Sequence, residues 1–332
     1  MASSGTVGTT SLDLAKLIEK TYRRCGLPTG AITPELIDIA KENLYLLFQN
    51  WSNRGINLWA IDQPLIALRQ HKATYDMPVG TIDVINALHR TLTTVTPSTT
   101  TVTATTVTNY FAASQTVKMF GITASALFTG ISFTFAGSAA GVTYTTLKTV
   151  STVTYANSPD VVWFAIDPIG DYQYYRITIT SAHTTTNLAL TLVSNYSDMS
   201  AERYNRDDYD NLPNKTFEGT PSLQYWFNRQ ITPTMTMWPV PSVSTNCLKL
   251  ITHRQVQDVG NDLTATLEIP DRWLDAVLWE LAVMCAVEIP LIPADRIALC
   301  QQMTTAALSL ADGEERDRAP SYLSVGVGVY NA

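Results

Sequence analysis

Charged side chains are scarce in this sequence. Asp, Glu, Lys and Arg make up 15% of its 332 residues, against about 25% in an ordinary globular protein. The net charge is -7, so the chain as a whole is a poor electrostatic match for a phosphate backbone, and we expect no sequence-specific DNA-binding module. The low charge predicts that partners cover much of the surface, although a large threonine-rich β domain would explain it equally well.

Paired cysteines, membrane-spanning runs and a secretion signal are also lacking. The four cysteines, Cys25, Cys247, Cys285 and Cys300, are far apart in the sequence and are expected to be buried, reduced thiols of a protein made in the cytoplasm. The first sixteen residues have neither a basic nor an apolar region. The longest apolar stretch, 276–292, contains Glu280 and Glu288 and is too short for a membrane span. We therefore expect a soluble protein that does not enter a membrane.

The sequence also lacks the familiar catalytic patterns. There is no phosphate-binding loop, dinucleotide fingerprint, zinc-protease helix or nucleophile elbow. The acidic run Asp207, Asp208 and Asp210 lacks the glycine and distal glutamate of a calcium loop. The histidines are scattered singly, at His71, His89, His183 and His253. We expect no enzyme activity, no bound metal and no cofactor.

What is present begins with helical patterns at both ends of the chain. Apolar residues at helical spacing, with capping residues and glycines at the ends, predict helices over 11–25 and 34–54. Pro270 and Asp271 open a third helix over 271–289, and a fourth spans 294–312. The charged and then glycine-spaced segment 313–332 cannot form a core by itself and is expected to be disordered or an extended arm.

Short strands lie between the helical regions. A hairpin is expected over 63–78, with its turn near residues 70–72, and strands are expected near 222–230, 234–238 and 247–254. Pro233 and Pro239 cannot donate a hydrogen bond to a β-ladder, so they mark where strand 234–238 begins and ends. Trp238 and Pro241 are then expected to cover the end of a small core.

The segment 93–195 has a different composition. More than half of residues 91–108 are threonine, and short runs rich in β-branched and aromatic residues recur through the segment. A disordered, glycosylated stalk would have a similar composition. Val and Tyr alternate with Thr at a period of two, however, which favours strands and hence a β-sandwich.

These patterns predict an α+β protein: a helical-bundle body with a small antiparallel β-sheet, plus an inserted all-β sandwich domain. The body is expected at 1–92 and 196–312, the sandwich at 93–195 and the arm at 313–332.

The segment 204–242 resembles the head-to-tail adaptor family of short-tailed bacteriophages, the tail accessory factors or tubular protein A-like proteins. The residues that carry the likeness are Tyr209, Leu212 to Lys215, Gly219 to Pro221, Gln224 and Tyr225, Pro233, and Trp238 to Pro241. Residues 53–90 and 269–283 add support. The likeness covers about 1–92 and 196–312, and the segment 93–195 departs from it.

The resemblance implies a structural protein of the virion, made in the host cytoplasm and placed at the head–tail junction. It implies a ring, expected to be a dodecamer, that binds beneath the portal protein, extends the DNA channel without binding DNA specifically, and docks the tail tube, nozzle or fibre proteins. Its arm would bind the portal through Tyr322, Leu323, Val325, Val327, Val329 and Tyr330. The loop around Tyr209, Asn214, Lys215 and Thr216 would lie at a subunit or tail contact, or would fold on its own domain.

The sandwich leaves another function open. On a virion surface it would bind a host glycan or brace capsid or fibre proteins. Trp163, Tyr172, Tyr174 and Tyr175 are the candidate sugar-stacking side chains. The alternative is that these aromatics fill the core of the sandwich.

Overall fold

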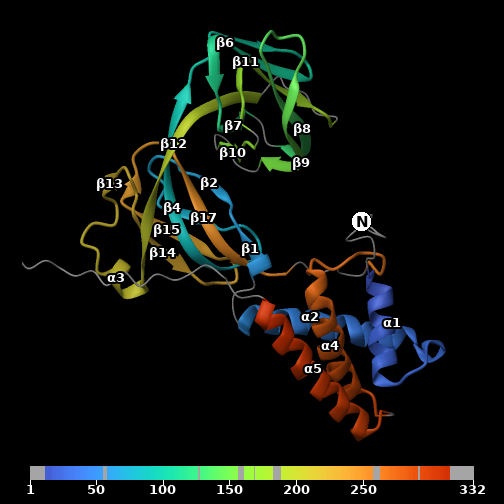
Figure 1. Ribbon diagram of the computed structural model, residues 1–332. Helices are drawn as coiled ribbons and strands as arrows, with labels where there is room; N and C mark the ends of the chain where they lie inside the picture. The colour runs from blue at the N-terminus through green and yellow to red at the C-terminus, as the bar shows by residue number, and fades with distance from the viewer. Residues whose placement is uncertain are drawn as a thin grey trace, which may run out of the picture. The chain divides into compact units, whose positions relative to one another are not determined.

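The computed structural model describes residues 12–54, 58–125, 128–155, 161–167, 169–181, 188–256, 262–290 and 292–314. The chain divides into two compact units. One is built from residues 1–61 and 255–332, and the other from residues 62–254. Figure 1 shows helices in the first unit and strands in most of the second. Each unit is described by itself.

The helical unit has four α-helices in its described part. Their bounds, with those of three short 3-10 turns, are α1 Leu14–Cys25, η1 Thr29–Ala31, α2 Pro34–Arg54, η2 Leu58–Ala60, η3 Asp271–Trp273, α4 Leu274–Glu288 and α5 Ala294–Glu314. Asp13 caps α1 by accepting a 2.9 Å hydrogen bond from the backbone N–H of Lys16. Gly26 ends the same helix at φ 95°, a conformation that favours glycine.

Helix α4 is the centre of this unit, because α1, α2 and α5 all pack against it. Its residues Val277, Leu281 and Cys285 are fully buried. Trp51 of α2 meets Trp273 edge to face at 4.9 Å between ring centroids. One continuous apolar core therefore joins helices from the two ends of the chain.

The second unit is almost entirely β-structure. Its strands are β1 Ile61–Asp62, β2 Leu65–Ala67, β3 Thr74–Asp76, β4 Thr81–Val95, β5 Thr99–Val102, β6 Thr106–Thr116, β7 Met119–Ala124, β8 Phe128–Ser138, β9 Thr145–Tyr155, β10 Val162–Ala165, β11 Asp171–Ile179, β12 Leu188–Tyr204, β13 Glu218–Gly219, β14 Gln224–Asn228, β15 Thr234–Trp238, β16 Val240–Pro241 and β17 Cys247–Arg254. A one-turn helix, α3 Arg206–Asp210, follows β12.

Within the described residues, ten of these strands form one sheet. Its main path runs β1-β17-β4-β12-β14-β15-β3, and β2, β7 and β10 join at its sides. The long strands β4 and β12 pair antiparallel, and Figure 1 shows β12 running from the lower part of this unit into its upper part. Arg90 of β4 and Asp198 of β12 form a double hydrogen bond with both distances at 2.6 Å.

The upper part of the unit is two sheets packed face to face. A five-stranded sheet, β5-β6-β11-β8-β9, shares a core with β7, β10 and the adjoining end of β12. Phe120 of β7 lies in the middle of that core. Its ring stacks on Phe135 at 4.1 Å and on Phe164 at 5.0 Å between centroids. This packing is that of a β-sandwich.

The expected fold class, a helical-bundle body with a small antiparallel sheet and an inserted sandwich, is wrong. Strands hold 43% of the described residues and helices 29%, and the segments assigned to the helical body supply most strands of a large curled sheet. The change in composition does not mark the boundary of a separate domain, because the threonine-rich region begins and ends inside strands. The positions 92/93 and 195/196 fall within β4 and β12.

Candidate functional site

The loop between β12 and β14 is held on a frame built around β15. Strand β15 pairs with β14 and β3, and Pro233 and Pro239 flank it as the sequence predicts. The carbonyl oxygen of Pro233 accepts a 3.0 Å hydrogen bond from the N–H of Met77, and that of Pro241 accepts one of the same length from His71. Pro233 and Pro239 thus mark the ends of the strand, and the carbonyl groups of Pro233 and Pro241 bind the backbone N–H groups of Met77 and His71.

Trp238 anchors the middle of this loop. Its indole N–H donates a 2.9 Å hydrogen bond to the carbonyl oxygen of Asn214, and its ring lies 6.0 Å from that of Phe217. The side-chain oxygen of Asn214 in turn accepts hydrogen bonds from the N–H and the hydroxyl of Thr216, at 3.1 and 2.9 Å. These contacts give residues 214–217 a defined conformation.

Tyr209 anchors the start of the loop. Its ring stacks on Trp226 of β14 with 5.4 Å between centroids and 20° between planes. Lys215 lies over the same tyrosine ring at 5.6 Å and 3.5 Å from a carboxylate oxygen of Asp210. Burial, and to a smaller extent the nearby negative charge of Asp210, raises the pKa of Tyr209 above its ordinary value.

The loop is therefore folded against its own unit through Tyr209, Asn214 and Thr216. It still presents groups to solvent, because Phe217 is 50% exposed and Asn214, Lys215 and Thr216 are exposed. Aromatic side chains such as Phe217 are enriched at protein contacts. The expectation that this loop contacts another subunit or the tail stays a prediction.

The four aromatics proposed to stack on a sugar do not share a surface. Trp163 is 6% exposed and Tyr175 is fully buried, and the hydroxyl of Tyr175 donates to the carbonyl oxygens of Gln115 and Gly170 at 2.6 and 2.9 Å. Tyr172 packs against the sandwich core. Only Tyr174 lies on the outer face of the five-stranded sheet, opposite the face that carries Tyr175.

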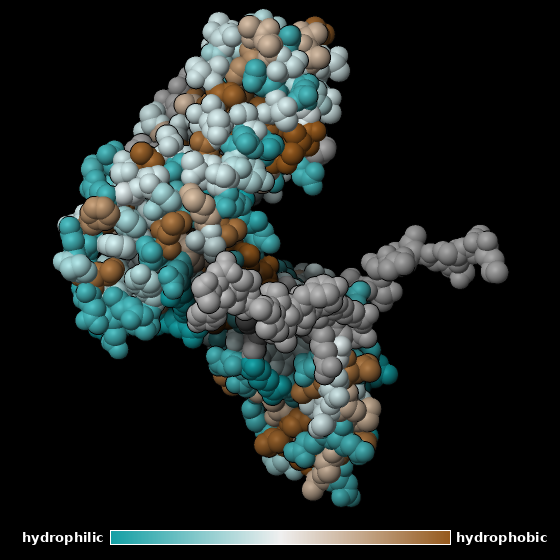
Figure 2. Space-filling view, turned by 60° about the vertical axis from the view of Figure 1, so that its left-hand side comes forward, coloured by the Kyte–Doolittle hydropathy of each residue, from teal (hydrophilic) through white to brown (hydrophobic). Residues whose placement is uncertain are grey.

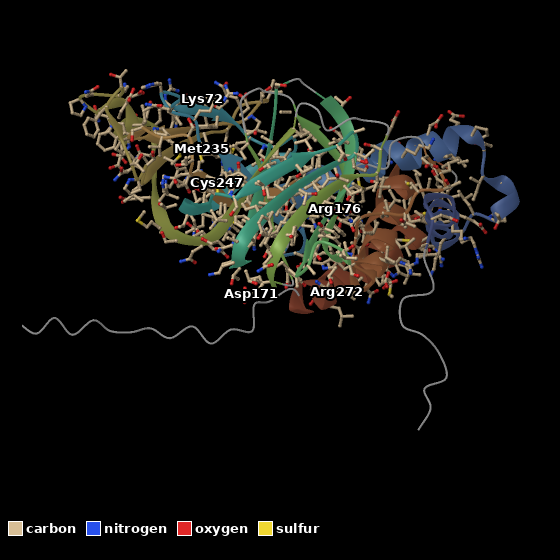
Figure 3. The ribbon with its side chains drawn as sticks, turned by 90° about the horizontal axis from the view of Figure 1, so that it is seen from above. Lys72, Asp171, Arg176, Met235, Cys247 and Arg272 are labelled. Carbon is tan, nitrogen blue, oxygen red and sulfur yellow. The ribbon has the colours of Figure 1, made fainter. Side chains whose placement is uncertain are left out.

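The structure adds partners for Tyr174 that the sequence did not indicate. Tyr110 of β6 is its cross-strand neighbour, with 4.8 Å between ring centroids. On the same strand as Tyr174, the guanidinium of Arg176 lies 3.6 Å from the ring centroid of Tyr144. Figure 3 labels Asp171 and Arg176, at the start and in the middle of β11. The pairing of β6 with β11 brings Tyr110 next to Tyr174, and such pairing cannot be predicted from one strand alone.

The helical unit leaves large apolar side chains uncovered on α2 and α5, and one, Val287, on α4. On α5, Leu299, Met303 and Leu310 recur at helical spacing along one flank, and Leu310 is 76% exposed. On α2, Tyr45 and Leu46 are about half exposed. In Figure 2 brown, hydrophobic residues are visible at the surface of the lower, helical unit. Neither face was predicted from the sequence, because apolar residues at helical spacing do not show which of them a neighbouring helix covers.

The four cysteines are buried and unpaired, as predicted. Burial raises the pKa of Cys25, Cys247 and Cys285 to about 12, so these thiols stay protonated near neutral pH and are poor nucleophiles. Over the described residues, no three His, Cys, Asp or Glu side chains are grouped to hold a metal ion. None of the helices that the structure describes is long and apolar enough to cross a membrane.

The arm residues Tyr322, Leu323, Val325, Val327, Val329 and Tyr330 lie outside the described residues. Their proposed role at the portal stays a prediction.

Comparisons with known proteins give no family. No family model matches the sequence, and no curated protein matches it. Among solved structures, the chain is similar to a family 32 carbohydrate-binding module of AlyQ in complex with 4,5-unsaturated mannuronic acid, at 9% identity and a TM-score of 0.21 over 36% of this chain and 97% of the module. It is also similar to the family 32 module of Clostridium perfringens NanJ in complex with galactose, at 11% identity and a TM-score of 0.20 over 43% of this chain and 97% of the module. TM-scores this low establish neither a shared fold nor a shared function.

Proposed function

We propose that this protein is a structural head-to-tail adaptor of a short-tailed phage. In this role several copies form a ring beneath the portal, and the chain has no catalytic function. The observation that carries the proposal is the pair of uncovered apolar faces on α2 and α5 of the helical unit. The resemblance of segment 204–242 to the adaptor family supports the same assignment.

The two faces are suited to contacts between copies. A ring closes when one surface of each copy binds a different surface of the next, and α2 and α5 present two unlike surfaces. The α5 face carries leucine and methionine and has no charged residue between Ile297 and Ala311, whereas the α2 face pairs Tyr45 with Leu46. Burying apolar area in such contacts contributes about 25 cal/mol per Å², so α2 of one copy meeting α5 of the next would stabilise the ring.

The charge of the chain suits a DNA channel. DNA must pass through an adaptor without being held, and a net charge of -7 disfavours binding to a phosphate backbone. The portal would be bound by the arm 313–332. The β unit, through the loop at Asn214 and Lys215, would face the tail tube, nozzle or fibre proteins.

Cross-linking between introduced cysteines tests the ring contact. We expect the double variant Tyr45→Cys/Leu310→Cys, treated with a short bifunctional maleimide, to give a ladder of oligomers that ends at one size. Each single variant should give no cross-linked product, because the helix face that its introduced cysteine meets on the next copy carries no introduced cysteine. The four native cysteines are not expected to react with the maleimide, because their thiols are buried and protonated. Dimers from either single variant, or no product from the double variant at high protein concentration, would contradict the proposal.

A second candidate function is glycan binding by the β unit. The specific observation that favours it is the paired Tyr110 and Tyr174 on the outer face of the five-stranded sheet. The two functions are compatible, because the proposed ring contacts lie in the helical unit. Binding of the full-length protein to an array of bacterial surface glycans tests this candidate, and failure to bind any of them would leave a bracing contact with a virion protein as the role of the sandwich.

A further inference from the structure

The outer face of the five-stranded sheet has an ordered arrangement of side chains. Along β11, Tyr175, Ile177 and Ile179 are buried in the sandwich core, so the alternating residues Tyr174, Arg176 and Thr178 point to the other face. That face is partly open to solvent, since none of these three side chains is buried.

Strand pairing extends this face into rows. Thr178 lies opposite Thr106 on one side and Thr134 on the other, and Thr134 lies opposite Thr149, which gives a row of threonines across four strands. Tyr174 lies opposite Tyr110. The upper part of the molecule in Figure 2 is mostly pale, the colour of residues of intermediate hydropathy such as threonine. Methyl groups, hydroxyls and aromatic rings thus share one sheet surface.

Arg176 is the residue on this face whose surroundings indicate a ligand. Its guanidinium stacks on Tyr144, and its Nε is buried without a hydrogen-bond partner. Among the residues that the structure describes, no carboxylate lies within ion-pair distance of it. A half-buried cation without a counter-ion is unfavourable, and a guanidinium binds carboxylates through parallel N–H donors.

We infer that this face binds a glycan that carries carboxylate groups. The solvent-facing side of the Tyr110–Tyr174 pair would contact the C–H groups of a sugar ring, because aromatic rings carry negative charge density on their faces. The terminal N–H groups of Arg176 would bind the sugar carboxylate, and the flanking threonine hydroxyls would bind sugar hydroxyls. This inference rests on the second candidate function and gives it a site and a ligand class.

Calorimetric titration of the full-length protein tests the site, with an oligogalacturonate tetrasaccharide and its methyl ester as matched probes. We expect the acid to bind and the ester, in which an uncharged methyl ester replaces each carboxylate, to bind about tenfold more weakly or not at all. Tyr174→Ala should weaken binding of the acid by about tenfold. Arg176→Gln should remove the preference for the acid over the ester.

Two controls separate the site from folding and from assembly. Arg229→Gln makes the same change at an exposed arginine outside the five-stranded sheet, where Arg229 pairs with Asp83, and should leave glycan binding unchanged. Sedimentation of each variant shows whether assembly is intact, so loss of the ring is distinguished from loss of the glycan site. Equal binding of the acid and the ester, no binding of either, or binding that survives both Tyr174→Ala and Arg176→Gln would overturn the inference.

Discussion

The indole N–H of Trp51 donates a 2.7 Å hydrogen bond to the carboxylate of Glu280, and the same carboxylate pairs with Arg54 at 2.6 Å. Glu280 is buried on α4, whereas Arg54 is more than half exposed. One acidic group in the helical core thus connects α4 to the end of α2. Because the carboxylate is desolvated, its partners matter more for stability than those of a surface ion pair.

Replacing Glu280 is therefore expected to destabilise the helical unit. Glu280→Ala leaves the indole N–H of Trp51 without a partner, and we expect a loss of about 1–3 kcal/mol in the free energy of unfolding. Glu280→Gln keeps an acceptor for Trp51 and should have a smaller effect. Urea unfolding followed by circular dichroism at a helix-sensitive wavelength measures both. If the two variants are equally stable, the hydrogen bond to Trp51 is not what makes Glu280 important.

In the β unit, Phe120 is expected to be the most sensitive core position of the sandwich. Its ring contacts Phe135 and Phe164 by stacking and Phe133 edge to face, so Phe120→Ala opens a cavity between both sheets. We expect a loss of about 3–5 kcal/mol, against about 1–2 kcal/mol for Phe120→Leu. Denaturant unfolding followed by tryptophan fluorescence measures the difference. A similar loss for both substitutions would show that ring stacking, rather than filled volume, stabilises this core.

The β unit is also expected to lose stability as the pH falls. Burial lowers the pKa of His89 and His253 below the ordinary value near 6.5. In the interval below that value the unfolded chain binds more protons than the folded chain, so the free energy of unfolding falls as the pH drops through about 6.5 towards the lowered values. His89 accepts a 3.3 Å hydrogen bond from the N–H of Ser222, which only the unprotonated ring nitrogen can do.

Urea midpoints measured from neutral pH to about pH 5 give the size of this effect. A His89→Gln/His253→Gln variant should show a flatter profile over that range. Asp13 and Asp262 belong to the helical unit, and hydrogen bonds from Lys16 and Thr264 lower the pKa values of their carboxyl groups. Their contribution to the free energy of unfolding is lost only at lower pH, below about 4. An equally steep profile in the double variant would assign the acid sensitivity to other groups.

The loop at 205–219 should open when its aromatic anchor is removed. Tyr209→Ala removes the stack on Trp226, and we expect faster amide exchange and proteolysis at residues 211–216 with a global loss of about 1 kcal/mol or less. Lys215→Ala, which keeps the stack, is the matched control. Unchanged exchange in the Tyr209 variant would mean that the hydrogen bond from Trp238 to Asn214 is sufficient to hold the loop.

Local signals predicted several elements closely. Thr33, Pro34 and the apolar spacing predicted a helix over 34–54, and α2 has those bounds. Pro233 and Pro239 predicted the ends of β15. These features depend on capping, φ restriction and missing N–H groups, which act within a few residues and can be read from one segment.

Long-range pairing could not be predicted in this way. A turn occurs at His71, at φ 64°, where the sequence suggested one, but the flanking strands β2 and β3 pair with β17 and β15 instead of with each other. The face that Tyr174 shares with Tyr110 likewise depends on the register of β6 against β11. The alternation of Tyr175, Ile177 and Ile179 did contain the signal that Tyr175 is a core residue.

The mass of the full-length protein in solution, measured by sedimentation over a range of concentrations, tests the proposed assembly most directly. We predict a closed oligomer of one size for the native protein, and monomers for Leu299→Glu/Met303→Glu, which places charges on the exposed flank of α5. Ile231→Glu, at a fully exposed apolar position of the β unit, should assemble like the native protein. A native protein that stays monomeric up to about millimolar concentration, or a charged variant that assembles normally, would contradict the account.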